Sequence, residues 1–106
     1  MTIKEDAGKF LIFIYKEYIK GNEWLVSKDF IETTKWDAGR INRAIDYLKD
    51  LRFIKIMQSL GNTNGVYNFG IRGLEPIGIN LIETPDEFKK NFGLEIKNPE
   101  TYEIVW

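Results

Sequence analysis

The spacing of apolar residues changes near Arg52, and this change constrains the fold more than any other feature. Before Arg52 apolar residues recur at steps of three and four, as on a helix with one buried face. After Arg52 apolar and other residues alternate, as on a half-buried strand. The helical stripe is Ile41, Ala44, Ile45, Leu48 and Leu51; the alternating run sets Ile54, Ile56, Gln58 and Leu60 against Lys55, Met57 and Ser59. The two patterns together predict an α+β fold.

Three helices are predicted ahead of this change. The first covers residues 5–20, where Ala7 begins a stripe that also contains Phe10, Leu11, Ile14 and Tyr18. The second runs over 28–34, with Ser27 as its N-cap. The third covers 37–51, and Asp37 is expected to cap its N-terminus.

A β-hairpin is the strongest short-range prediction. Residues 61–65 contain Gly-Asn and Asn-Gly steps, and a second alternating run follows them at Tyr67, Phe69 and Ile71. Asn-Gly between two alternating runs is typical of a hairpin turn. Residues 24–26 are long enough only for a strand fragment.

Two short helices and a strand are expected after the hairpin. Pro76 suits the first position of a helix. Residues Thr84–Glu87 have the spacing of a capping box, and the helix they begin is expected to end at Gly93. The tail, residues 94–106, alternates again and predicts a terminal strand or hairpin.

The composition excludes most catalytic and metal-binding chemistry. The chain has 106 residues, a formal net charge of −1, and neither Cys nor His. Disulfides, zinc sites built on Cys or His, and a catalytic imidazole are therefore excluded. The segment 61–65 lacks the Lys-Ser/Thr of a phosphate-binding loop. We expect one domain that is not an enzyme and has no cofactor or metal site.

No segment of the sequence predicts a membrane or export signal. The longest apolar run near the N-terminus, Phe10–Tyr15, has six residues, whereas a membrane-spanning helix needs about 20. Acidic Glu5 and Asp6 precede this run, where a secretory signal would carry positive charge. We expect a cytoplasmic protein without a membrane partner.

Two segments carry a resemblance to a known family. Arg40–Ile54 resembles the recognition helix and first wing strand of winged helix-turn-helix domains from bacterial and archaeal transcriptional regulators, with Arg52 where the family usually has glycine. Leu74–Ile79 resembles the start of the helix that follows the wing in that family. The order of predicted elements is also that of the family. The resemblance covers residues 7–83.

The resemblance implies a winged-helix fold, with a three-helix core and a β-hairpin wing. The winged-helix domain would then be residues 1–83, and residues 84–106 would form an extension packed on the same domain. Family members insert the third helix into the major groove of DNA. The resemblance therefore implies a DNA-binding transcriptional regulator whose partner is double-stranded DNA. The residues expected to contact DNA are Lys35, Trp36, Arg40, Asn42, Arg43, Tyr47, Asn62, Thr63 and Asn64.

Charge and composition leave alternatives to DNA binding open. Residues 1–82 carry 12 Lys+Arg and 10 Asp+Glu, a net charge of +2, but residues 56–71 contain no Lys or Arg. A wing that grips DNA normally supplies a cation. The charges of the third helix could equally be ordinary solvated groups, Trp36 could plug the turn, and Tyr47 could pack against Arg43.

Two hypotheses accommodate a weakly basic surface. A homodimer, formed through the first helix and the C-terminal segment, would read two half-sites. Its seam would use Ile12, Phe13, Ile19, Tyr102, Ile104 and Trp106, although the same residues could cover the core of one chain. Alternatively, the domain is a protein–protein interaction module at the N-terminus of a larger protein, with little or no DNA binding.

Overall fold

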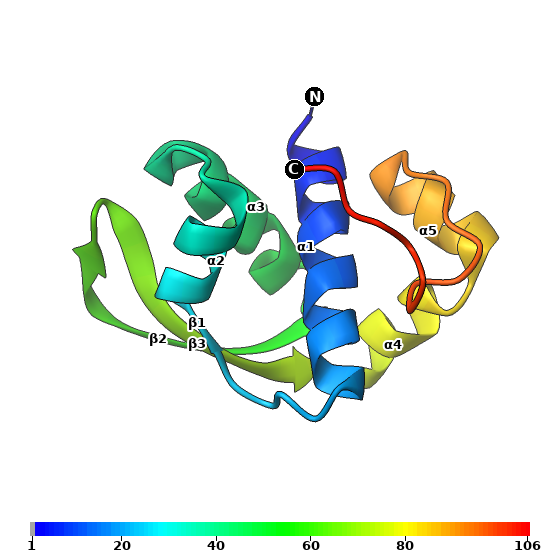
Figure 1. Ribbon diagram of the computed structural model, residues 1–106, viewed down its shortest axis with the longest axis horizontal. Coiled ribbons are helices and arrows are strands. Elements are labelled where there is room, and N and C mark those ends of the chain that lie inside the picture. The colour runs from blue at the N-terminus through cyan, green and yellow to red at the C-terminus, as the bar shows by residue number, and fades with distance from the viewer. Residues whose placement is uncertain (1) are drawn as a thin grey trace.

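The computed structural model describes residues 2–106 and has an α+β architecture. Within these residues it contains five helices and a three-stranded antiparallel sheet (Figure 1). Helices α1, α2 and α3 lie over one face of the sheet, whereas α4 and α5 lie on the other side of α1. The elements are α1 Ile3–Ile19, β1 Leu25–Val26, α2 Ser27–Thr34, α3 Ala38–Asp50, β2 Ile54–Thr63, β3 Val66–Leu74, α4 Pro76–Ile82 and α5 Pro85–Phe92.

The hairpin prediction is confirmed, and its turn is tighter than residues 61–65. The sheet order is β1-β3-β2, so β3 pairs with both other strands. The strands turn at Asn64 and Gly65, whose φ angles are +53° and +85°. Two consecutive positive φ values belong to the type I′ turn, which matches the twist of a hairpin and favours Asn-Gly.

The outer half of β2 does not bury its apolar side, which corrects the prediction for Leu60. Pairing with β3 is regular at Met57 and Gln58 but irregular between Gln58 and Asn62. Leu60 lies in this irregular stretch and is 99% exposed. Ile54 is buried as predicted. The exposure is specific to β2, because Val66 of β3, directly after the turn, is 2% exposed and belongs to the core.

The predicted apolar stripe of the third helix is confirmed in its central part. Ile41, Ala44, Ile45 and Leu48 on α3 are completely buried, whereas Leu51, just after the helix, is exposed. On α1 the predicted stripe is buried except for Tyr18. Helix α1 also buries Ile12, because it packs against α3 on one side and against α5 on the other. A helix at the centre of the molecule needs more than one apolar face.

Of the two predicted N-caps, Asp37 is confirmed and Ser27 is wrong. The Asp37 carboxylate accepts the backbone N–H of Arg40 at 3.0 Å. Ser27 is the first residue of α2, and its hydroxyl instead donates to the carbonyl of Tyr67 at 2.6 Å and accepts from the N–H of Phe69 at 3.0 Å. The Ser27 hydroxyl therefore ties α2 to β3.

The two C-terminal helices form as predicted, but the capping box does not. Pro76 is at the start of α4, and Gly93, with φ of +72°, ends α5. The hydroxyl of Thr84 donates to the carbonyl of Asn80 at 2.7 Å rather than capping α5. Because that oxygen belongs to the last turns of α4, Thr84 finishes one helix instead of starting the next. Phe88 and Phe92 of α5 are fully buried in the common core.

The tail forms no strand within the described residues, which corrects the prediction for 94–106. It runs as an irregular segment in front of α1 (red in Figure 1). Lys16 donates to the carbonyl of Tyr102 at 2.6 Å, and Ile96 is buried. A helix offers no free strand edge, so the tail packs through side chains instead.

Most residues of the predicted dimer seam are packed within one chain. Ile12 is completely buried, and the rings of Phe13 and Trp106 meet edge to face with centroids 5.7 Å apart. Ile19 is exposed, but Ile104 packs against the core. Within residues 2–106, no helix is both long and apolar enough to cross a membrane.

Candidate functional site

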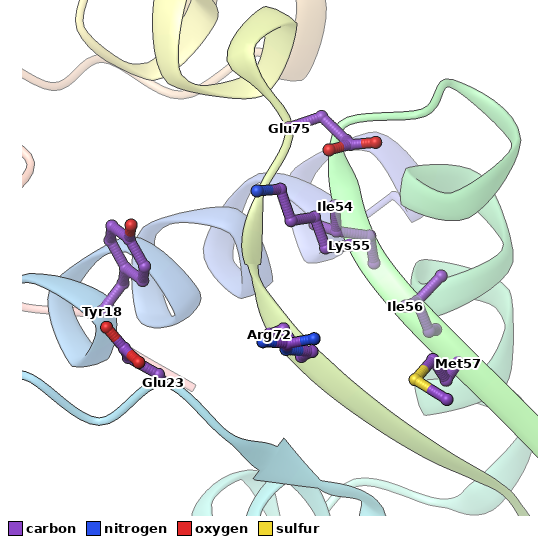
Figure 2. A pocket seen from close by; sticks show the side chains of 8 residues that line it. All are labelled: Tyr18, Glu23, Ile54, Lys55, Ile56, Met57, Arg72 and Glu75. Carbon is purple, nitrogen blue, oxygen red and sulfur yellow. The ribbon is translucent and has the colours of Figure 1, made fainter.

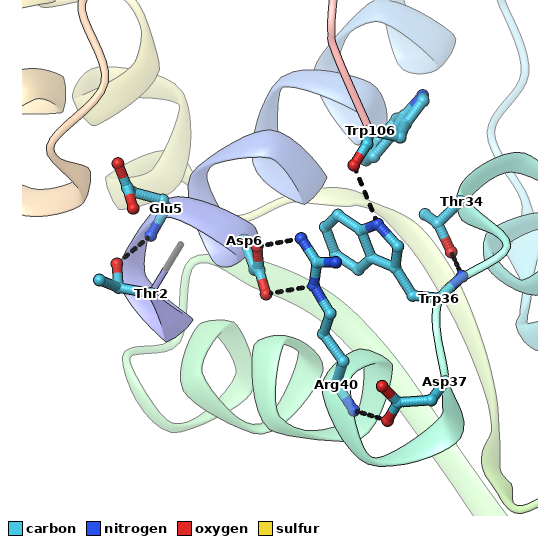
Figure 3. Close-up of polar contacts among 8 residues, drawn as sticks. All are labelled: Thr2, Glu5, Asp6, Thr34, Trp36, Asp37, Arg40 and Trp106. Carbon is cyan, nitrogen blue, oxygen red and sulfur yellow. Dashed lines mark hydrogen bonds and ion pairs between the residues drawn. The ribbon is translucent and has the colours of Figure 1, made fainter.

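The guanidinium group of Arg40 is turned toward α1 and not away from the protein (Figure 3). Its Nε donates to Asp6 Oδ2 at 2.8 Å and its Nη2 to Asp6 Oδ1 at 3.0 Å. The Arg40 side chain is 17% exposed and that of Asp6 is 7% exposed. This two-point geometry is the strong form of an arginine–carboxylate pair. The cation of Arg40 is therefore already balanced inside the protein.

Trp36 is half-buried beneath Arg40 and behaves as the plug of the α2–α3 turn. Its ring lies 3.6 Å from the Arg40 guanidinium carbon and stacks on Phe10 with centroids 5.2 Å apart. Its Nε1 donates to the carbonyl of Trp106 at 3.1 Å, so the tail covers this side of the turn (Figure 3). The indole and its N–H are both used within the chain.

Asn42 ties α3 to the hairpin. Its Nδ2 donates to the carbonyl of Gly65 at 3.0 Å, and its Oδ1 accepts the backbone N–H of Tyr67 at 3.0 Å. The same side of α3 also carries Asp46, which accepts from the hydroxyl of Tyr67 at 3.4 Å, and Lys49, which donates to Gln58. Both ends of the Asn42 amide are thus occupied by backbone groups of the hairpin.

Lys35 and Arg43 are the predicted cationic DNA contacts that remain open to solvent. Lys35 ends α2 with φ of +59°, and Arg43 lies along the exposed face of α3. Neither side chain has a hydrogen bond or ion pair among residues 2–106. Tyr47 is half-buried, and its ring lies 6.4 Å from that of Phe92 on α5. It therefore faces α5, not solvent alone.

The polar residues at the hairpin tip mainly maintain the turn. Asn62 Oδ1 accepts the N–H of Gly65 at 3.1 Å, and the Thr63 hydroxyl donates to Asn68 at 2.7 Å. Asn64 supplies the first positive φ of the turn. These side chains are exposed, but none is charged.

A different group of side chains gathers on the face of the sheet that the helices leave uncovered (Figure 2). Trp24 lies across Gly70 of β3: a Cβ atom on that glycine would be 2.3 Å from Trp24 Cζ2. Met57 pairs with Gly70 from β2 and is 63% exposed, while Trp24 is 48% exposed. Glycine at position 70 allows the indole to lie directly on the sheet, with much of the ring open to solvent.

Charged residues surround this apolar centre. A shallow hollow of about 570 Å³ beside Met57 is lined by four of them, Glu23, Lys55, Arg72 and Glu75. None of the four charged side chains of this hollow has a hydrogen bond or ion pair within residues 2–106. We call this surface, Trp24 included, the open face; its residues are Tyr18, Glu23, Trp24, Lys55, Met57, Arg72 and Glu75.

The sequence held part of the signal for the open face. Alternation in the first hairpin strand separates Lys55 and Met57 from Ile54, and in the structure Lys55 and Met57 are exposed whereas Ile54 is buried. Nothing local linked these residues to Tyr18 or Trp24, which arrive from the end of α1 and from the loop before β1. The prediction concentrated on α3 and missed the surface that the sheet leaves open.

Comparison with models of protein families, with curated proteins and with solved structures yields no significant match. In the part of the chain that the structure describes, no group of three or more acidic side chains is arranged to hold a metal ion. What the protein does is therefore inferred from its own surfaces.

Proposed function

We propose that the chain is a winged-helix-like protein-interaction module that binds a protein partner through the open face. The layout supports this class: α2 and α3 are joined by residues 35–37, and the β2–β3 hairpin follows α3 directly. Short helix-turn-helix connections and a hairpin wing are features of that fold. The same fold serves both DNA binding and protein binding, so the function depends on the surface.

The composition of the open face is the observation that carries the proposal. Trp24, Met57 and Arg72 are exposed; Met57 lines one hollow with Trp24 and a second with Arg72 and Tyr18. Tryptophan, tyrosine, methionine and arginine are the residue types enriched at the centres of protein interfaces. Tryptophan, tyrosine and arginine also dominate binding energies measured by alanine substitution.

The electrostatics of α3 weigh against DNA as the main partner. Arg40 is neutralised by Asp6, and the outward side of the helix also carries Asp46 and Asp50. The hairpin contributes no cation between residues 56 and 71. Phosphate contacts by Lys and Arg supply most of the non-specific affinity for DNA, and here few are available.

DNA binding remains the second candidate because Lys35 and Arg43 are exposed and unpaired at the α2–α3 turn and on α3. In the predicted regulator these two cations would contact phosphates while α3 lies in the major groove. A single chain with two such contacts would bind weakly and with a shallow salt dependence.

Fluorescence anisotropy of a labelled AT-rich duplex pool at low salt separates the two candidates. A protein-interaction module predicts no binding by the wild type. Weak binding by the wild type that is lost in Lys35→Ala/Arg43→Ala would favour the regulator. Tyr18→Ala is the matched control, because that residue lies on the open face and away from α3.

The positive test is capture of a protein partner by three immobilised forms of the chain. The wild type and Lys35→Ala/Arg43→Ala should retain the same partner, whereas Trp24→Ala/Arg72→Ala should lose it. Retention by the open-face variant and loss by the α3 variant would overturn the proposal. Circular dichroism of each variant establishes that it is folded before capture is compared.

A further inference from the structure

We infer that the partner seated on the open face is a second copy of this chain. The inference rests on the proposed function and identifies the occupant of the same surface. It places the interface on the uncovered sheet face, to which α1 contributes only Tyr18, and not along α1 and the tail. Most residues of the dimer seam predicted along α1 and the tail already contact residues of the same chain, as Phe13 does with Trp106.

The charges of the open face are balanced and unpaired. Lys55 and Arg72 supply two cations, and Glu23 and Glu75 supply two carboxylates, around one hollow. None of the four has a hydrogen bond or ion pair within residues 2–106. All four are therefore free to meet opposite charges on a facing surface, where complementary charges steer the encounter and fix the register.

Self-association satisfies this pattern better than a partner of one charge. A nucleic acid or acidic peptide would meet Glu23 and Glu75, and a basic peptide would meet Lys55 and Arg72. In a two-fold interface the same patch occurs on both subunits, so a patch with equal numbers of both signs can be complementary to itself. The formal net charge of −1 adds almost no long-range repulsion between two copies.

The apolar centre supplies the area that two copies would bury. The indole of Trp24 lies close against Gly70 and is 48% exposed, and Met57, 63% exposed, lines the same hollow as Trp24. The Trp24 Nε1 has no acceptor among residues 2–106, unlike that of Trp36. Trp24 and Met57 would form the apolar centre of the interface, with the charged groups around it as the rim.

The edge of the sheet is a poorer surface for a second copy than its face. One edge is β1, which has only two residues; the other is β2, whose pairing with β3 is irregular between Ile54 and Ile56 and again between Gln58 and Asn62. Bulges of this kind bend an edge strand and block strand addition. We therefore assign face-to-face and not edge-to-edge pairing.

The unmodified protein provides the first test. Sedimentation velocity from micromolar to millimolar concentration should show a monomer converting to a species of twice the mass. Over the same range, the indole signal of Trp24 in a ¹H–¹⁵N correlation spectrum should move, while that of Trp36 should not. A protein that stays monomeric at millimolar concentration, or in which Trp24 does not respond, overturns the inference.

A charge-swap experiment tests the pairing itself. Lys55→Glu/Arg72→Glu makes the open face wholly acidic, and Glu23→Lys/Glu75→Lys makes it wholly basic. We expect each variant alone to lose self-association by at least about tenfold, and an equimolar mixture to recover a heterodimer. Dimers that persist in both single variants, or a mixture that remains monomeric while both variants are folded, contradict the inference.

Lys90→Glu/Lys97→Glu is the matched control for Lys55→Glu/Arg72→Glu, because it makes the same change in net charge at exposed residues of α5 and the tail. It should dimerise as the wild type does.

The two proposals fail separately. If the wild type is monomeric but still captures another protein through Trp24 and Arg72, self-association is ruled out and the proposed function stands. If the chain instead binds DNA through Lys35 and Arg43, the proposed function is ruled out.

Discussion

The guanidinium of Arg40 and the carboxylate of Asp6 form a two-point ion pair between α3 and α1, with N–O distances of 2.8 and 3.0 Å. Trp36 lies against the guanidinium, 3.6 Å from its carbon. Both charges are largely shielded from water. The pair therefore joins two helices of the core and also removes a cation from the side of α3 that would face DNA.

Asp6→Asn should destabilise the protein by about 2–4 kcal/mol, because it leaves Arg40 shielded and without its counter-charge. Urea denaturation measures this loss. The double variant Asp6→Leu/Arg40→Met should recover most of it, since it removes both charges and keeps apolar volume. Asp50→Asn, at an exposed position of α3, is the control and should change the unfolding free energy by less than about 0.5 kcal/mol. A loss no larger than that of the control would mean that the pair is not formed in solution.

Asn42→Ala should loosen the hairpin from α3 and lower stability by about 1–2 kcal/mol. The change removes the acceptor for the N–H of Tyr67 and the donor to the carbonyl of Gly65. Hydrogen exchange should therefore accelerate at the Tyr67 amide more than at the Ile71 amide in the middle of the sheet. Asn42→Asp keeps the acceptor alone and should protect Tyr67 while still losing the contact to Gly65. Unchanged exchange at Tyr67 in Asn42→Ala would contradict this role.

The elements themselves were predictable because their signals are local. The stripe that includes Ile41 and Leu48, the cap at Asp37, the Asn-Gly turn and Pro76 each act within a few residues. One turn of backbone is enough to express such preferences. The Ser27 hydroxyl failed as a cap because a strand 40 residues later competes for it.

The candidate site could not be predicted in the same way, because its residues are defined by distant partners. Arg40 was expected to face DNA, yet Asp6 lies 34 residues earlier and holds it inward. Trp24 needed Gly70 beneath it, 46 positions away, to become an exposed platform. Alternation gave the side of the strand on which Met57 lies, but it did not show that helices would cover only the other side.

Gly70→Ala should displace Trp24 from the sheet. The new methyl group would sit 2.3 Å from Trp24 Cζ2, so the indole must move. Overpacking of this kind costs about 1–3 kcal/mol, which urea denaturation would detect. Trp24→Ala in the same chain should relieve most of that cost, so the two changes should be strongly non-additive. Additive effects would show that the indole does not lie on Gly70 in solution.

The hydrogen bond between Tyr15 and Glu83 should make stability fall at alkaline pH. The Tyr15 hydroxyl donates to Glu83 Oε2 at 2.6 Å, and this bond, with burial and the nearby carboxylate charge, raises the pKa of Tyr15 to about 12. An unfolded tyrosine has a pKa of about 10. Below pH 10 both states keep the proton, so this contribution is fully present; between pH 10 and 12 the unfolded chain releases it first, and stability declines.

Tyr15→Phe should therefore lower the unfolding free energy by about 1 kcal/mol at neutral pH and make its decline between pH 10 and 12 shallower. Urea denaturation across that range, at fixed ionic strength, measures both effects. Tyr18→Phe is the matched control, because the Tyr18 hydroxyl has no partner among residues 2–106. It should leave the alkaline slope as in the wild type. Equal slopes in all three proteins would mean that Glu83 does not hold the Tyr15 proton, and that α1 and the end of α4 are joined by packing alone.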